Sequence, residues 1–146
     1  MKIRSNTGRG LRAGFSLAEL MVVIVIIGLL ATFVVPNVMS KFTTAQLTKA
    51  KADLKTIADA VESYRMDNSA RFPDDLEALV TKDDRGTSYL NSDVVPKDPW
   101  GNEYVYEPPS GGDSQFYIWC YGRDGVQGGE GEDLDFNNRM VTNGEI

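Results

Sequence analysis

The part of the chain richest in ligand-type side chains lies near its C-terminus. Residues 121–135 hold five acidic residues and five glycines. Oxygen ligands without nitrogen or sulfur suit Ca²⁺, which takes roughly six to eight of them, and glycines let the backbone bend so that several oxygens converge. The EF-hand spacing fails at Val126 and Gly128, and residues 128–133 give only one copy of a calcium-binding repeat that needs stacked neighbours. The stretch is therefore either a cation site or a solvated acidic loop.

A second candidate for chemistry is a single carboxylate, Glu19, at the edge of a long apolar run. A charged side chain at membrane depth costs a few kcal/mol unless something pairs with it. Glu19 is therefore either solvated at the level of the lipid headgroups or paired with a cation, and an intersubunit pair is favoured over one within the same helix.

Composition excludes several other kinds of site. The chain has no histidine, which removes the commonest general base and transition-metal ligand. Its only cysteine, Cys120, excludes an internal disulfide and a cysteine-based zinc cluster. No activated nucleophile pattern is present, so an enzyme is disfavoured. A net charge of −6 disfavours nucleic acid as a partner.

The apolar run that holds Glu19 predicts a membrane anchor. Residues 20–40 contain no charge, and as a helix they would rise about 32 Å, close to the hydrocarbon thickness of a bilayer. Residues 1–14 carry four basic residues and no acid, so we expect the N-terminus to stay in the cytoplasm and the rest to cross the membrane. A cleaved secretory signal is disfavoured because the run is too long and residues 34–38 form a poor cleavage site.

Beyond the apolar run, hydrophobic residues continue along one helix face. They are Leu47, Ala50, Leu54, Ile57, Val61 and Tyr64. This stripe predicts a helix that packs on the chain's own sheet. A coiled coil is the alternative, but the stripe is shorter than three heptads, and a coiled coil usually needs more. We expect the helix to end at residues 67–69 and to be weakest at Gly28 and Pro36, which are poor helix formers.

The C-terminal half predicts a small β module. Residues 73–80 have the pattern of a short capped helix. Residues 103–107 and 115–121 are strand candidates, and residues 108–113 are a hairpin loop between them. A long N-terminal helix, transmembrane in its first half and packed on a small antiparallel sheet, gives an α+β fold.

The sequence around Glu19 resembles a known processing signal. Residues 14–20, Gly-Phe-Ser-Leu-Ala-Glu-Leu, follow a basic leader and precede an apolar helix, as in type IV pilins and pseudopilins. The resemblance implies that a prepilin peptidase cuts between Gly14 and Phe15 and N-methylates Phe15. It also implies that Glu19 pairs with the N-terminal ammonium of an adjacent subunit, which fixes axial register in a filament.

The C-terminal half resembles the major pseudopilins of type II secretion systems. Residues 98–104, Asp-Pro-Trp-Gly-Asn-Glu-Tyr, are similar to the family's signature, in which Trp100 serves as a packing anchor. The resemblance implies one Ca²⁺ in the acidic loop. Its ligands would come from the carbonyls of Tyr121 and Val126 and from the side chains of Asp124, Asp133 and Asp135, with Glu132 a possible replacement for one of the acidic pair.

These resemblances imply a pilin-like fold and a structural function. We expect a leader at residues 1–14, a transmembrane and filament-core helix at 15–38, and a periplasmic domain at 39–146. The subunit would lie in the bacterial inner membrane as a single-pass protein and polymerise into a helical filament that exports folded proteins. Its partners would be further copies, minor pseudopilins, prepilin peptidase and the inner-membrane secretion platform. The alternative is a type IV pilus subunit for adhesion, motility or DNA uptake, which the missing cysteine pair disfavours.

Overall fold

The computed structural model describes residues 14–111 and 113–146, apart from the side chains of residues 36, 37 and 40. Contacts divide the chain into two compact units, Met1–Ser40 and Lys41–Ile146. Of the leader predicted for residues 1–14, only Gly14 lies within the described residues. The boundary predicted between residues 38 and 39 concerns the membrane, and it stays a prediction.

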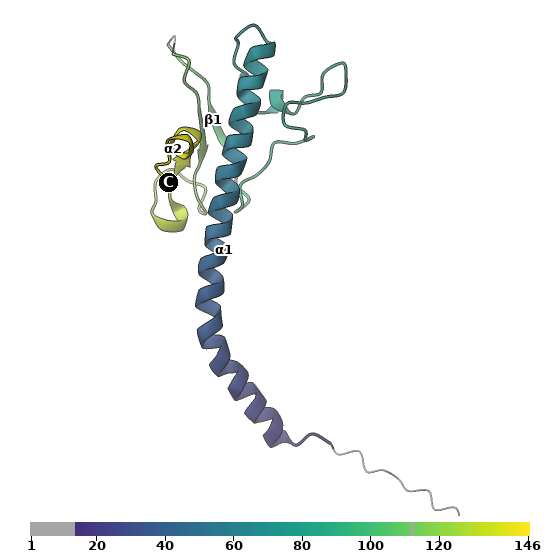
Figure 1. Cartoon of the computed structure of the whole chain (residues 1–146), viewed down its shortest axis with the longest axis vertical. Helices are drawn as coiled ribbons and strands as arrows, with labels where there is room; N and C mark the ends of the chain where they lie inside the picture. The colour runs from purple at the N-terminus through teal and green to yellow at the C-terminus, as the bar shows by residue number, and fades with distance from the viewer. Residues whose placement is uncertain (1–13, 112) are drawn as a thin grey trace, which may run out of the picture. The chain divides into compact units, whose positions relative to one another are not determined.

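One helix, α1, spans Leu17–Asp67 and ends where the sequence predicts (Figure 1). It runs through Gly28 and Pro36 without interruption. Within it, Leu17–Val35 has a mean hydropathy of 2.8 and none of its length is buried. This span is long and apolar enough to cross a bilayer.

The second half of α1 carries the predicted stripe into a core. Ala50, Leu54, Ile57 and Val61 are fully buried. They share one hydrophobic cluster with residues of the sheet, and Leu47 and Tyr64 pack against it from either end of the stripe. The prediction that this face packs on the chain's own sheet is confirmed, and the coiled-coil alternative is wrong for these residues.

The sheet has three antiparallel strands in the order β1-β2-β3. They are β1 (Val105–Glu107), β2 (Tyr117–Cys120) and β3 (Phe136–Asn137). The two predicted strands exist but are shorter than predicted. Along β2, Ile118 and Cys120 face the core, because alternate residues of a strand point to opposite faces.

Two short elements differ from the prediction. The capped helix predicted at residues 73–80 is wrong: only one 3₁₀ turn forms, η1 at Glu77–Leu79. Asp75 accepts a hydrogen bond from the Ala78 N–H at 3.0 Å. The segment is nevertheless too short for an α-helix, because the first turn loses conformational entropy that only further hydrogen bonds offset. The sequence also did not predict α2 (Asn138–Asn143), whose N-terminus is capped by the side chain of Asn137.

Candidate assembly and cation sites

The first turn of α1 holds Glu19 through reciprocal hydrogen bonds. The backbone N–H of Ser16 donates to Glu19 Oε2 at 2.9 Å, and the N–H of Glu19 donates to Ser16 Oγ at 3.1 Å. This arrangement is a capping box, which satisfies two N–H groups that a helix start would otherwise leave unpaired. Sequence reasoning did not single out Ser16, although the Ser-x-x-Glu spacing before an apolar run is a recognised signal.

The predicted cleavage position lies directly ahead of this box. Gly14 and Phe15 are outside helical structure and exposed, and the side chain of Phe15 is 86% exposed. A Cβ built on Gly14 would meet no other atom within 4 Å. An exposed, non-helical peptide bond is the kind of segment that a protease can bind in extended form.

The acidic loop at residues 121–135 is closed by backbone hydrogen bonds. Arg123 N–H donates to the Glu132 carbonyl at 3.0 Å, and Gly125 N–H donates to the Tyr121 carbonyl at 3.1 Å. Asp124 caps its own turn by accepting a hydrogen bond from the Val126 N–H at 3.2 Å. The structure therefore places the predicted carbonyl of Tyr121 and the side chain of Asp124 in one tight turn.

Two glycines of the loop lie against the backbone of Asp133. At Gly122, with φ of 57°, an added Cβ would lie 2.6 Å from the Asp133 carbonyl carbon. At Gly129, with φ of 140°, it would lie 2.3 Å from the Asp133 carbonyl oxygen. Only glycine fits this approach, because it lacks a Cβ and adopts positive φ without strain. The two glycines thus leave the space that the backbone of Asp133 occupies.

The predicted carboxylate ligands have different surroundings. Glu132 accepts a hydrogen bond from Thr43 Oγ1 at 2.8 Å and pairs with Arg123 at 2.6 Å. One oxygen of Asp135 accepts from the Gly128 N–H at 2.7 Å. The Oδ1 atoms of Asp133 and Asp135 are buried without a hydrogen-bond partner, although Asp133 Oδ1 lies 3.4 Å from Arg123 Nε.

Buried carboxylate oxygens without a hydrogen bond are costly, and a hard cation would remove that cost. Asp135 and Asp133 therefore fit Ca²⁺ by this criterion, although Arg123 already lies against Asp133 as well as Glu132. In the part of the chain that the structure describes, no three acidic, histidine or cysteine side chains are grouped closely enough to form a metal centre. The arrangement thus contains two of the predicted ligands but not an assembled ligand shell.

A turn built around the buried side chain of Asp98 supports one side of the acidic loop. Asp98 Oδ1 accepts hydrogen bonds from the N–H groups of Trp100 at 3.0 Å and Asn102 at 2.7 Å. Asn102 Nδ2 in turn donates to the Gly122 carbonyl at 3.0 Å. Sequence reasoning missed Asn102, because nothing in the local pattern reveals a contact 20 residues away. Trp100 packs against the core, as predicted.

Cys120 is buried beside this turn, with its sulfur 3.7 Å from Asp98 Oδ2. Burial, together with the nearby Asp98 charge, raises the pKa of the Cys120 thiol to about 12. The thiol is therefore protonated at neutral pH and unreactive, which agrees with the inert role predicted for it.

Known protein families and relatives match the sequence along most of the chain. The family described as type II secretion system (T2SS), protein G, matches residues 37–139, and the prokaryotic N-terminal methylation motif matches residues 9–35. The chain is 43% identical over 136 residues to type II secretion system core protein G of Pseudomonas aeruginosa, covering 87% of this chain and 94% of that protein. It is 41% identical over 134 residues to the core protein G of Vibrio cholerae, covering 87% and 91%.

A solved structure is also similar. The crystal structure of the major pseudopilin from the type 2 secretion system of enterohaemorrhagic Escherichia coli matches with a TM-score of 0.53 and 34% identity, covering 72% of this chain and 96% of that one. The apolar helix, the three-stranded sheet and these matches lead to one assignment. The chain belongs to the family of type II secretion system core protein G, the major pseudopilins, which are structural proteins and not enzymes.

Proposed function

We propose that the protein is a subunit that polymerises into a periplasmic pseudopilus and drives the export of folded proteins across the outer membrane. The observation that carries this proposal is the apolar span Leu17–Val35, none of which is buried. Such a surface is stable in water only if something covers it, and a lipid bilayer before assembly and neighbouring subunits after it both do so. Minor pseudopilins and the inner-membrane secretion platform are the further partners.

Processing by a prepilin peptidase precedes assembly in this proposal. The enzyme cuts between Gly14 and Phe15 and methylates the new amine of Phe15. The basic residues of the leader keep this end in the cytoplasm, so the unit Lys41–Ile146 lies in the periplasm. Mass analysis of the membrane-purified protein should give a chain beginning at N-methylated Phe15. An intact leader in cells that hold an active peptidase would contradict the proposal.

Glu19 provides the register between subunits. In the uncut chain its carboxylate is held by Ser16, and cleavage creates an ammonium one residue ahead of that cap. The carboxylate of one subunit then pairs with the ammonium of a neighbour, because leaving either charge alone in an apolar environment costs several kcal/mol.

The Glu19→Val variant tests this role. We expect it to enter the membrane and be cleaved normally but to form no filaments by electron microscopy. Ser16→Ala is the matched control, since it removes one half of the capping box and keeps the carboxylate, and we expect it to assemble. Filaments of normal yield from Glu19→Val would contradict the register role.

The acidic loop binds Ca²⁺ in the same proposal. Asp133 and Asp135 supply carboxylate oxygens, and the turn that holds Asp124 and the carbonyls of Tyr121 and Val126 supplies others. The support is the pair of buried Oδ1 atoms of Asp133 and Asp135, neither of which accepts a hydrogen bond within the described residues. When bound, the ion would neutralise the two carboxylates and join the ends of a glycine-rich loop, the stapling role that a disulfide has in other small domains.

Calcium-dependent thermal unfolding tests this site. Asp124→Ala and Asp135→Ala should lower the unfolding temperature in millimolar Ca²⁺ and have little effect in excess chelator, because only the bound form loses a ligand. Glu130→Ala is the control, since Glu130 is exposed in the same loop and outside the predicted ligand set. An equal loss of stability with and without Ca²⁺ would count against the site.

A further inference from the structure

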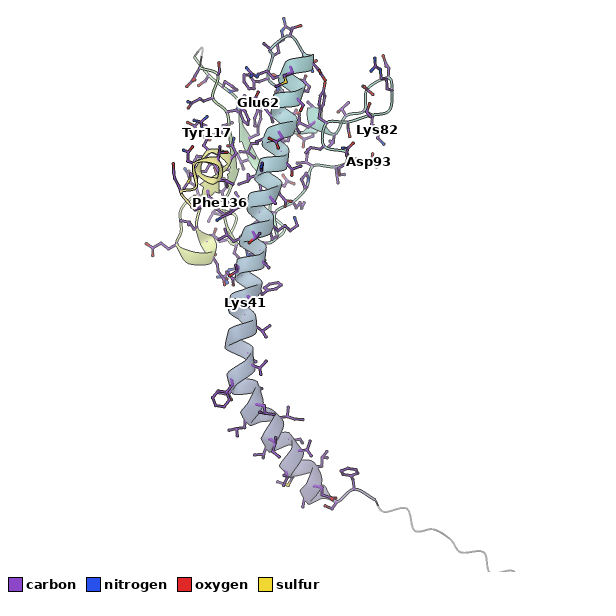
Figure 2. The ribbon with its side chains drawn as sticks, in the orientation of Figure 1. Lys41, Glu62, Lys82, Asp93, Tyr117 and Phe136 are labelled. Carbon is purple, nitrogen blue, oxygen red and sulfur yellow. The ribbon has the colours of Figure 1, made fainter. Side chains whose placement is uncertain are left out.

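A groove of about 620 Å³ lies within the unit Lys41–Ile146, between the segment that carries η1, residues 93–97 and β1. Its charged lining residues are Asp74, Asp75, Glu77, Asp93 and Glu103, opposed by Lys97 alone. Asp93 pairs with Lys82 on the same loop (Figure 2), and one oxygen of Asp75 accepts a hydrogen bond from the Ala78 N–H. Asp74, Glu77 and Glu103 form no ion pair within the described residues, so the groove has a surplus of negative charge.

Apolar side chains lie between these carboxylates. Val94 and Val105 line the groove and are 68% and 39% exposed. The hydroxyl of Tyr106 is buried there without a hydrogen-bond partner in the described part of the chain. Burial raises the pKa of Tyr106 to about 12, and the charge of Asp74 contributes, so its oxygen is neutral and able to accept a hydrogen bond. This combination fits a group with an apolar stem and a cationic, hydrogen-donating end, such as a lysine side chain.

The chain presents such side chains elsewhere on the same unit. Three lysines lie on one side of α1: Lys41 (Figure 2), Lys51 and Lys55. Viewed down the helix axis they fall within about 80°, because successive residues are rotated by about 100° around it. Within the described residues none of the three forms an ion pair, whereas Lys49, on another side of the helix, pairs with Asp53. We call Lys41, Lys51 and Lys55 the lysine stripe.

We propose that the acidic groove of one subunit docks the lysine stripe of a second copy of this chain. The inference rests on the proposed function, because it names one contact by which the filament is built. The groove and the stripe are different surfaces of the chain, so a contact between them can be head-to-tail, and such a contact propagates when its rotation does not close, as a filament requires. Charge complementarity selects this occupant over an apolar peptide, which would leave the carboxylates without cations.

Paired cysteines test the contact in full-length protein in membranes where filaments form. Val94→Cys marks the groove, and Thr48→Cys marks the stripe while leaving every lysine intact. Thr56→Cys is the matched control, because both threonines are exposed and each hydroxyl donates to a backbone carbonyl of α1. Thr56 is rotated by about 80° around the helix axis from Thr48, so it lies outside the stripe. The native Cys120 is buried and protonated, so it should not react.

A short bismaleimide crosslinker should convert the Val94→Cys/Thr48→Cys chain into a ladder of multimers, at several times the yield of the Val94→Cys/Thr56→Cys chain. Equal yields from both chains, or no ladder while filaments are visible, would overturn the contact and leave the proposed function standing. Absence of filaments from the unaltered chain would instead overturn the proposed function.

A second measurement covers the case in which the cysteine chains fail to assemble. Lys55→Gln should lower filament yield by roughly threefold, the size expected for losing one exposed ion pair. Lys49→Gln is its control and should leave the yield unchanged, because its partner lies in the same helix. Equal yields from the two variants would contradict the proposal.

Discussion

The two halves of α1 are both rich in apolar residues, but they differ in what covers those residues. In the first half Ile27 is 60% exposed, while in the second half Ile57 is fully buried. Backbone hydrogen bonds are satisfied inside the helix in both halves, so helix formation does not depend on the covering. The first half therefore needs a cover that the described chain does not supply, whereas the second half is covered by the chain's own sheet.

The largest expected effect comes from removing the first half. A chain that begins at Lys41 should stay folded and soluble without detergent, because the unit Lys41–Ile146 contains the hydrophobic core. The full chain should need detergent or membrane. Circular dichroism and size-exclusion chromatography would compare the two chains. An unfolded or aggregated short chain would show that the second half is not self-sufficient.

Substitution of matched isoleucines sharpens the same comparison. Ile57→Ala should lower the free energy of unfolding of the unit Lys41–Ile146 by about 2–5 kcal/mol, because it removes buried volume and leaves a cavity. Ile27→Ala should leave that free energy unchanged. Chemical denaturation of both variants in detergent gives the two values, and similar losses would break the distinction between the two halves.

A smaller loss of stability is expected at the turn around Asp98. Asp98→Ala should destabilise the same unit by about 1–3 kcal/mol, because the N–H groups of Trp100 and Asn102 lose their acceptor. Asp98→Asn keeps one acceptor oxygen and should lose less. The expected order in urea unfolding is wild type, then asparagine, then alanine. A neutral alanine variant would show that solvent replaces these hydrogen bonds.

The smallest effect concerns an exposed loop of the second unit. Hydrogen bonds from the backbone N–H and the hydroxyl of Thr87, and from the N–H of Arg85, hold the pKa of Asp83 below its usual value. Because the folded pKa is lowered, the stabilisation is present above the ordinary aspartate pKa and is lost as pH falls through the folded value. The unfolding temperature should therefore fall slightly less on acidification in Asp83→Asn than in wild type. Asp84→Asn is the control, and an equal change in both would contradict this account.

Much of the fold follows from long, repeated patterns. The apolar run and the stripe from Leu47 to Tyr64 predict α1 correctly, because each of many residues adds to the same signal. The short elements fail for the opposite reason. A two-residue strand such as β3 and a six-residue helix such as α2 have too few residues for a periodic signal, and pairing with β2 stabilises β3.

The candidate sites divide in the same way. Gly14, Phe15 and Glu19 are candidates through the resemblance of residues 14–20 to a pilin processing signal, whereas the cap from Ser16 is local and was open to prediction. The sequence also locates the acidic loop. It does not distinguish the carboxylates of this loop: Arg123 pairs with Glu132 and Asp133, while Asp133 and Asp135 each keep one buried oxygen without a hydrogen bond.

The sequence by itself determined a membrane-length apolar helix with one carboxylate near its start, and an amphipathic continuation that packs on a small sheet. Only the tertiary structure decided which polar groups are satisfied. The Asp98 turn bonds to Asn102, and Asn102 reaches Gly122 across 20 residues of sequence. Such contacts depend on positions in space that many other residues set together, whereas a helix period is recorded in the order of neighbouring residues.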